Sequence, residues 1–196
     1  IGGMEAARVL KLRGHDPVIY EKNNVLGGTF IPASAESYKG KLRELLAWYR
    51  RQMKELDVEV HLGKEIDSVE KFGDAPVIIA TGSVPRVMKN IPGHERMIEA
   101  CDYLNGRDVG ERVVVIGGGL TGSEIAYELA LQGKRPVIVE MKNDLVAQKG
   151  VCLANSSYLR EWFELHEVPV YLETKLKEVK EPVSYTHLRA HETRHD

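Results

Sequence analysis

The spacing of apolar residues along the chain predicts that strands and helices alternate. Short apolar runs such as RVVVI are typical of strands buried in a parallel sheet, whereas apolar residues recur at helical spacing between positions 40 and 56. A glycine-bearing loop is predicted at 22–38. The helices are predicted at 3–13, 40–56, 97–104, 119–132 and 156–166, and the strands at 17–21, 58–62, 65–70, 76–80, 112–116, 136–140 and 168–172. This order indicates an α/β protein with mostly parallel sheets.

The helix-then-strand pattern occurs twice. Residues 3–24, GMEAARVLKLRGHDPVIYEKNN, align without a gap on residues 122–143, GSEIAYELALQGKRPVIVEMKN, at a constant offset of 119 (122 − 3). Each copy begins with a glycine and has an acid at the end of its strand, Glu21 in the first copy and Glu140 in the second. One chain with two copies of the same unit predicts two similar domains.

A glycine-rich turn precedes the second copy and indicates its purpose. The strand RVVVI is followed by GGGLTG, which matches G-x-G-x-x-G, and then by a helix and a strand that ends at Glu140. Gly117 permits the tight turn, Gly119 lets a pyrophosphate approach the backbone, and Gly122 lets the helix pack close to the strand. The phosphates would lie at the N-terminus of the helix, and Glu140 would accept hydrogen bonds from ribose hydroxyls. The complete order predicts a dinucleotide-binding domain.

The first copy begins within the equivalent turn. Gly3 takes the place of the third glycine, so we expect the opening strand and the first two glycines to precede Ile1. We therefore interpret the chain as a fragment of a longer protein.

Composition narrows the class of partner. The net charge of −2 over 196 residues favours neither nucleic acid nor an anionic membrane, and no apolar run is long enough to span a bilayer, which predicts a cytoplasmic protein. Cys101 and Cys152 match no C-x-x-C pattern, and we interpret them as two reduced, buried thiols. The segment 39–54 is basic and contains Trp48 and Tyr49, but its helical spacing of apolar residues favours a packed helix over a nucleic-acid site.

Further motifs in the same order resemble the two-dinucleotide-binding flavoproteins, in which an NAD(P)H domain is inserted in an FAD domain. They are Glu21 with Lys22, the sequence LGG, the sequence VIIATG and the complete glycine-rich turn. The runs LGGTF, KGKLRELLAWYRRQM, VEVHLGKEI and RVVVIGGGLTGSEIAYELALQGK resemble the C-terminal half of the 2,4-dienoyl-CoA reductase and trimethylamine dehydrogenase group. Members of that group resemble old yellow enzyme in an N-terminal FMN barrel, which an iron–sulfur cluster follows. The resemblance covers residue 1 to about residue 182.

The resemblance implies two Rossmann-like domains, both incomplete in this chain. Residues 1–106 would form an N-terminally truncated FAD domain, and 107–182 a C-terminally truncated NAD(P)H domain. Residues carried over to the FAD site are Gly3, Glu21, Lys22, Gly28, Thr29, the backbone of Ile66, Ala80, Thr81 and Gly82. Residues carried over to the NAD(P)H site are Gly117, Gly119, Leu120, Thr121, Gly122 and Glu140. No acid, base or nucleophile is an evident catalyst, so the catalytic residues stay unknown.

The resemblance also implies an NAD(P)H-dependent flavin oxidoreductase. Hydride would pass from the nicotinamide to FAD, and electrons would continue to a distant FMN site that reduces an activated C=C bond of a small-molecule substrate. The chain has no FMN barrel and no iron–sulfur cysteine cluster, and the absence of Cys from 27–40 argues against a disulfide-reductase mechanism. Two alternatives stay open: a stand-alone NADH:acceptor reductase or glutamate-synthase-small-subunit-like flavoprotein, and a non-catalytic nucleotide-binding module. The oligomeric state, including a homo-oligomer, is also open.

Two choices within the site depend on acidic residues. Glu140 favours NAD(H) over NADP(H), because an acid repels a 2′-phosphate and no Arg follows it closely, although Lys142 leaves NADP(H) open. Glu5 and Glu124 lie in the first turns of their predicted helices, where each either contacts the nucleotide or complements the helix dipole.

The end of the chain contains a zinc-like pattern. His191 and His195 match H-E-x-x-H, the spacing of metalloprotease zinc ligands. However, no distant third ligand is evident, and the string VSYTHLRAHETRHD resembles a translated sequencing adapter. We therefore interpret 183–196 as a non-native tail and predict no metal site.

Overall fold

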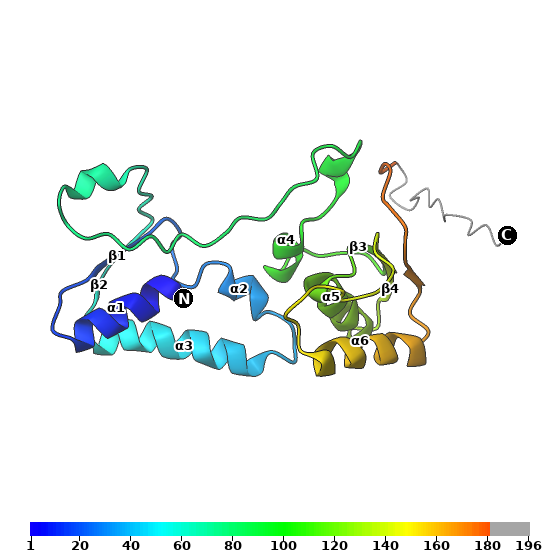
Figure 1. Cartoon of the computed structure of the whole chain (residues 1–196), viewed down its shortest axis with the longest axis horizontal. Coiled ribbons are helices and arrows are strands. Elements are labelled where there is room, and N and C mark those ends of the chain that lie inside the picture. The colour runs from blue at the N-terminus through cyan, green and yellow to red at the C-terminus, as the bar shows by residue number, and fades with distance from the viewer. Residues whose placement is uncertain (181–196) are drawn as a thin grey trace. The chain divides into compact units, whose positions relative to one another are not determined.

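The computed structural model describes residues 1–180 and divides the chain into two compact units. The first unit is Ile1–Pro85, and the second begins at Arg86 (Figure 1). Because each unit has its own hydrophobic core, each is described by itself.

The second unit contains a three-stranded parallel sheet in the order β3-β4-β5. Val113 pairs with Pro136 and Ile138 pairs with Val170, so β4 is the central strand. The core lies between the sheet and the helices, where Phe163 and Leu129 are each 1% exposed. The elements are η2 (His94–Arg96), α4 (Ala100–Leu104), β3 (Arg112–Ile116), α5 (Leu120–Leu131), β4 (Arg135–Val139), α6 (Leu153–Leu165) and β5 (Val170–Tyr171).

The first unit contains a two-stranded parallel sheet in which Val18 of β1 pairs with Glu59 of β2. Its core is formed mainly by α1 and α3, with Met4 and Met53 among the most buried side chains. The elements are α1 (Gly2–Leu12), β1 (Val18–Glu21), α2 (Phe30–Ala33), α3 (Gly40–Glu55), β2 (Glu59–Leu62) and η1 (Val69–Phe72).

The second half of each unit is also duplicated, at a different offset. Residues 40–62 align on 150–172 with an offset of 110 (150 − 40), so α3 and β2 correspond to α6 and β5. Each of these helices is followed by a residue in the left-handed region, Asp57 at φ 51° and Glu167 at φ 54°. The repeat recognised in the sequence therefore continues through the second helix and the last strand of each unit.

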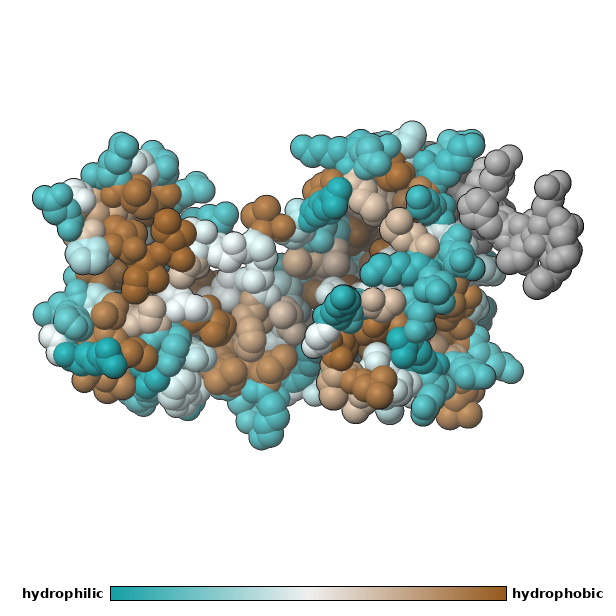
Figure 2. All heavy atoms as spheres, viewed as in Figure 1, coloured by the Kyte–Doolittle hydropathy of each residue, from teal (hydrophilic) through white to brown (hydrophobic). Residues whose placement is uncertain are grey.

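Three predicted elements of the first unit are wrong. The predicted loop 22–38 contains the short helix α2, and the predicted strand 65–70 gives way to a 3₁₀ helix, η1, whose N-terminus is capped by Ser68. The predicted strand 76–80 forms no regular element and pairs with no strand among the described residues. Its apolar side chains face solvent, with Ile79 at 73% exposure, and Figure 2 shows hydrophobic surface on this unit. Apolar β-branched residues form a strand only where a neighbour satisfies their backbone groups.

Candidate nucleotide-binding sites

The glycine-rich turn of the second unit joins β3 to α5. The N–H of Gly117 donates to the carbonyl of Val139 at 2.8 Å, which ties the turn to the end of β4. Gly117 has φ 104°, a conformation that favours glycine. A Cβ on Gly122 would overlap the carbonyl oxygen of Gly117. Both positions therefore need glycine for the fold itself.

Gly119 differs from these two glycines. It is the N-cap residue of α5 with φ −68° and ψ −178°, a backbone conformation that any residue adopts. A Cβ there would make only an ordinary contact, 3.4 Å from Oε1 of Gln148. Leu120 and Thr121 open the helix, and its first N–H groups have no intrahelical acceptor. Nothing in residues 1–180 requires glycine at Gly119, whereas a pyrophosphate against this backbone would, so the turn fits a dinucleotide.

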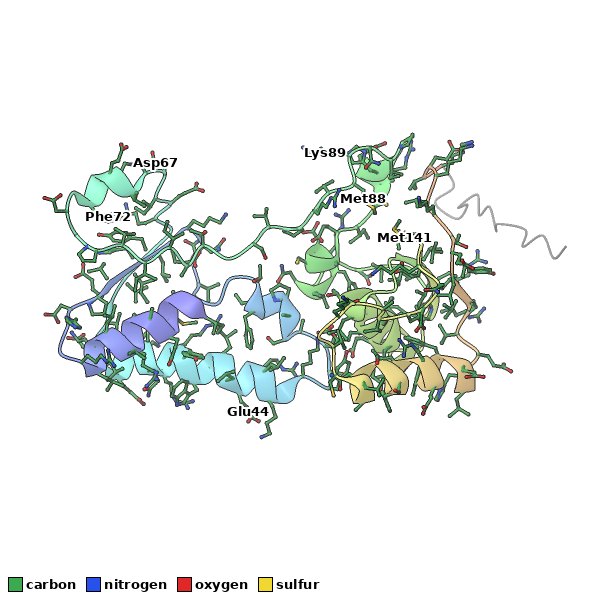
Figure 3. All side chains as sticks on the ribbon, viewed as in Figure 1. Glu44, Asp67, Phe72, Met88, Lys89 and Met141 are labelled. Carbon is green, nitrogen blue, oxygen red and sulfur yellow. The ribbon has the colours of Figure 1, made fainter. Side chains whose placement is uncertain are left out.

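Glu140 is held rigidly beside this turn. It follows the last residue of β4, is 7% exposed, and accepts hydrogen bonds through both carboxylate oxygens. Oε2 accepts from the N–H of Gly118 at 2.6 Å, and Oε1 accepts from the N–H of Lys142 at 2.7 Å. Since each carboxylate oxygen has two acceptor sites, the group can still accept from ribose hydroxyls. The next residue, Met141, is 60% exposed and is labelled in Figure 3.

The sequence analysis missed Gly118. This glycine is buried, and a Cβ there would overlap Cδ2 of Leu145. Its carbonyl accepts from the N–H of Val146 at 2.7 Å and from Oγ of Ser123 at 3.2 Å. The signal was present as a fourth glycine in the turn, but the G-x-G-x-x-G pattern assigns that position no role.

The first unit repeats the acid and its backbone contact. Glu21 ends β1, and its Oε1 accepts from the N–H of Asn23 at 2.9 Å and from the side-chain Nδ2 of the same residue at 2.7 Å. Oε1 of Glu140 accepts from the N–H of Lys142 in the same way, and 142 − 23 gives the repeat offset of 119. The two acids therefore have equivalent local geometry.

The structure brings two of the predicted FAD residues together. Gly3 lies in the first turn of α1, and a Cβ there would lie 3.4 Å from Cβ of Ala80. The segment Ala80–Thr81–Gly82 is exposed, and Gly82 has φ 70°. The predicted crossing segment thus passes directly over the start of α1.

Gly28 and Thr29 lie at the start of α2, where the chain turns sharply. Gly27 has φ 135°, and a Cβ there would lie 2.9 Å from Cγ1 of Ile31 and 3.0 Å from Cδ1 of Leu46. Gly28 has φ 52° and is exposed, and Thr29 is the N-cap residue of α2. Gly27 therefore allows the close packing, and Gly28 and Thr29 remain accessible.

The other two predicted FAD residues lie apart from these. Lys22 is exposed just after β1, and Ile66, at 37% exposure, lies in the segment between β2 and η1 rather than in a strand.

Glu5, one of the two acids with alternative roles, pairs within its own helix. Nε and Nη2 of Arg8 donate to its carboxylate at 2.7 and 2.8 Å. These hydrogen bonds lower the pKa of Glu5. The pairing favours a structural role for Glu5 in α1.

The cysteines differ from their predicted burial. Both are free, but Cys152 is exposed and Cys101 is half-buried. Burial, together with the neighbouring Glu99, raises the pKa of the Cys101 thiol. The prediction of two buried thiols is therefore wrong for Cys152, which lies at the N-cap of α6 where solvent reaches it.

Residues 1–180 have neither the side-chain clusters of a metal site nor a helix suited to a membrane. Within that range no group of three or more His, Cys, Asp or Glu side chains is placed to hold a metal ion. The H-E-x-x-H pattern at 191–195 and the proposed tail 183–196 lie outside the described residues. No helix in the described part of the chain has the length and apolar character needed to cross a membrane.

Comparison with known proteins decides the family. The family model described as pyridine nucleotide-disulphide oxidoreductase matches residues 1–194. The chain belongs to the pyridine nucleotide-disulphide oxidoreductase family. This family's FAD- and NAD(P)-binding fold agrees with the two parallel α/β units, and the predicted α/β, Rossmann-like fold class is confirmed.

Similar proteins within the family are flavoprotein reductases. The chain is 40% identical over 174 residues to the cinnamate reductase of Clostridium sporogenes, covering 87% of this chain and 26% of that protein. It is 40% identical over 152 residues to the NADH oxidase of Thermoanaerobacter brockii, covering 73% and 23%. Among solved structures, a 2-naphthoyl-CoA reductase superposes with a TM-score of 0.78 at 26% identity, covering 91% and 27%.

These comparisons confirm the predicted resemblance to the dienoyl-CoA reductase and old-yellow-enzyme-like flavoproteins. The chain spans about a quarter of the length of these three proteins.

Proposed function

We propose that this chain is the FAD- and NAD(P)H-binding part of a longer reductase that acts on activated C=C bonds. The first unit would hold FAD and the second the nicotinamide nucleotide. The observation that carries the proposal is the glycine-rich turn with Glu140 fixed beside it, because residues 1–180 leave room for a side chain at Gly119 and a bound pyrophosphate would not. A bound flavin and nicotinamide would supply the hydride-transfer chemistry.

The residues of this chain would bind and orient rather than react. In the second unit the first N–H groups of α5 would face the pyrophosphate, and Glu140 would accept hydrogen bonds from ribose hydroxyls. In the first unit Glu21 would make the equivalent ribose contact, with Gly3 and Ala80 close to the phosphates. Lys22, Gly28, Thr29, Thr81, Gly82 and the backbone of Ile66 would complete the FAD site, and Leu120 and Thr121 the nicotinamide nucleotide site.

The names of similar proteins support the substrate class. Cinnamate reductase and 2-naphthoyl-CoA reductase name conjugated, unsaturated acids or their thioesters as what those proteins act on. We infer that the longer protein reduces a substrate of this kind at an FMN site, with an iron–sulfur cluster between FMN and FAD. Both of these groups and the small-molecule substrate site would lie in parts of the protein outside this chain.

We further propose that NADH is preferred over NADPH. The N–H groups of Gly118 and Lys142 donate to the carboxylate of Glu140 and keep it beside the expected ribose position. There it would repel a 2′-phosphate. Within 141–144 there is no Arg to receive that phosphate.

A second function is favoured by one comparison. The NADH oxidase of Thermoanaerobacter brockii is as similar in identity as the cinnamate reductase, which supports an NADH:acceptor reductase that needs no C=C substrate. The two functions share the nucleotide sites and differ in the electron acceptor.

Titration of the purified 196-residue chain with NADH by calorimetry tests the nucleotide sites. We expect saturable binding of NADH with one site in the second unit, and competition by ADP-ribose, which carries the same pyrophosphate. Absence of binding by both ligands would contradict the proposal. The acceptor is tested with the longer protein: NADH oxidation that depends on added cinnamate or an aryl-CoA thioester supports the first function, and NADH oxidation with oxygen alone supports the second.

A further inference from the structure

Two arginines make the same contact in the two units. Arg50 of α3 donates to the backbone carbonyl of Leu26 through Nε at 2.9 Å and Nη2 at 2.6 Å. Arg160 of α6 donates to the carbonyl of Leu145 through Nε at 3.1 Å and Nη2 at 2.7 Å. The leucines are 119 residues apart (145 − 26) and the arginines 110 (160 − 50), which are the offsets of the two halves of the repeat. The contact is therefore part of the duplicated unit.

In the second unit this contact leads to the glycine-rich turn. The carbonyl of Leu145 and the N–H of Val146 belong to one peptide group. The carbonyl accepts from Arg160, and the N–H donates to the carbonyl of Gly118 at 2.7 Å. The N–H of Gly118 in turn donates to Oε2 of Glu140 at 2.6 Å. A continuous chain of hydrogen bonds thus joins α6 to the turn and to the acid.

The peptide between Leu145 and Val146 needs this support. The two residues are 4% and 3% exposed, so a carbonyl without a donor would be buried and unsatisfied. Val146 has φ 50°, which a β-branched residue rarely adopts. The guanidinium charge polarises the peptide and strengthens the hydrogen bond that its N–H makes. Asp144 also forms an ion pair with Arg160, 2.8 Å from Nη2, but its side chain is 47% exposed, and solvent weakens such a pair.

We propose that Arg160 is a positioning residue for the pyrophosphate site of the second unit. It acts through the Leu145–Val146 peptide, which fixes the glycine-rich turn in the conformation that receives the phosphates. Arg50 holds the corresponding peptide, Leu26–Gly27, in the first unit. The inference rests on the proposed nucleotide site, and it adds a residue that the sequence motif does not contain.

The test compares two probes on the 196-residue chain and its variants. ADP-ribose carries the pyrophosphate, whereas adenosine carries the base and ribose alone. We expect Arg160→Met to weaken ADP-ribose binding about tenfold, the range for losing hydrogen bonds to a charged group, while adenosine affinity stays unchanged. A general loss of folding would weaken both probes. Arg160→Lys keeps the charge but loses the two-pronged contact, so its effect should fall between those of the parent and Arg160→Met.

A chemical rescue, a control variant and amide exchange separate positioning from stability. Methylguanidinium added to Arg160→Ala should restore ADP-ribose binding, because it can occupy the emptied place and donate to the carbonyl. Asp144→Asn, which removes the ion pair but leaves both carbonyl bonds, is the matched control and should bind ADP-ribose like the parent. In the ligand-free chain, Arg160→Lys should raise the hydrogen-exchange rate of the Val146 amide about tenfold or more. The hydrogen bond from this amide to the carbonyl of Gly118 would open more easily.

The outcomes distinguish this inference from the proposed function. Parent and Arg160 variants that bind ADP-ribose equally well would overturn the positioning role alone. Equal losses for ADP-ribose and adenosine would also overturn it, because they would show a general structural effect. A parent chain that binds neither ADP-ribose nor NADH would overturn the nucleotide site and this inference with it.

Discussion

Single residues in the glycine-rich turn serve either the fold or the ligand, and the structure separates the two. Gly117 has a positive φ and Gly122 lies against the carbonyl of Gly117, so the protein itself requires both, and Gly118 packs closely against Leu145. Gly119 alone has an ordinary conformation and space around it. The sequence motif assigned roles to three of these glycines, but only the structure shows which of them the protein can spare.

Replacing Gly119 with valine should therefore remove nucleotide binding and leave folding almost unchanged. The branched side chain would occupy the place of the pyrophosphate, where overpacking costs about 1–3 kcal/mol or more. Calorimetric titration with NADH and a urea unfolding curve measure the two effects. Gly122→Ala is the matched control, and it should destabilise the fold because its Cβ overlaps the Gly117 carbonyl. A Gly119→Val variant that binds NADH as tightly as the parent would show that the site is misassigned.

The acid at Glu140 should set the choice between NADH and NADPH. Glu140→Ala combined with Met141→Arg removes the repulsion and places a cation on an exposed position, since Met141 is 60% exposed. We expect the preference for NADH to narrow or reverse, with a change of about 1–3 kcal/mol for the new charged hydrogen bond. The dissociation constants of both nucleotides are measured for the parent and the double variant. Tighter binding of NADPH than of NADH by the parent would rule out the role given to Glu140.

At the scale of secondary structure, sequence and structure agree where the pattern is long and packed. The helix at 40–56 was predicted because its apolar positions repeat over several turns. The strand that leads to each acid was predicted from a short apolar run, and it pairs with a neighbouring strand in the structure. The predicted strands at 65–70 and 76–80 were wrong because their apolar residues, such as Ile78 at 60% exposure, find no partner in the described chain. Local preference for a strand does not decide the conformation of a segment that nothing covers.

The arginine contacts show a different limit of sequence reasoning. Arg50 and Arg160 bind backbone carbonyls, and any residue provides such a carbonyl, so no motif marks the partner. Alignment of 40–62 on 150–172 pairs the two arginines and is the signal that would have found them. The first repeat was evident without a gap, whereas the second is visible only after the offset changes from 119 to 110.

The ends of the helices provide a stability prediction. In α6 the N–H of Glu167 donates to the carbonyl of Glu164, and the N–H of Val168 donates to the carbonyl of Phe163, which is a Schellman motif. The motif needs a left-handed residue, and Gly133 supplies it after α5, but Glu167 must adopt φ 54° with a long side chain.

We expect Glu167→Gly to stabilise the chain by about 0.5–1 kcal/mol, because glycine adopts this conformation without steric cost. Asp57→Gly, at the equivalent position after α3, should gain less, since Asp tolerates the left-handed region better than Glu. Urea unfolding midpoints of both variants and the parent provide the measurement. A lower midpoint for Glu167→Gly would mean that the glutamate side chain contributes a contact that outweighs the strain.

At the scale of the whole chain, the two units differ in how many strands and how many turn glycines support the nucleotide site. The central strand β4 pairs with β3 on one side and β5 on the other, and the glycine-rich turn follows β3 directly. Its counterpart β1 pairs with β2 alone within residues 1–180, so its second edge has backbone groups without a strand partner there. The first unit also offers one glycine of the turn, Gly3, where the second offers all three.

The 196-residue chain should therefore bind nicotinamide nucleotide well and FAD poorly. The part of the turn equivalent to 117–119 is not supplied by this chain in the first unit, and each hydrogen bond from its backbone to a charged phosphate would contribute about 1.5–3 kcal/mol. Within residues 1–180 the core of the first unit is also smaller, with five buried residues in its cluster where the second unit has nine. Absorbance at the flavin bands after gel filtration with added FAD, beside an NADH titration of the same sample, compares the two sites directly. FAD retained in a one-to-one ratio would show that a two-stranded sheet and a single glycine suffice to hold a dinucleotide. Loss of both ligands would show that the second unit needs more than its three strands to keep the turn in place.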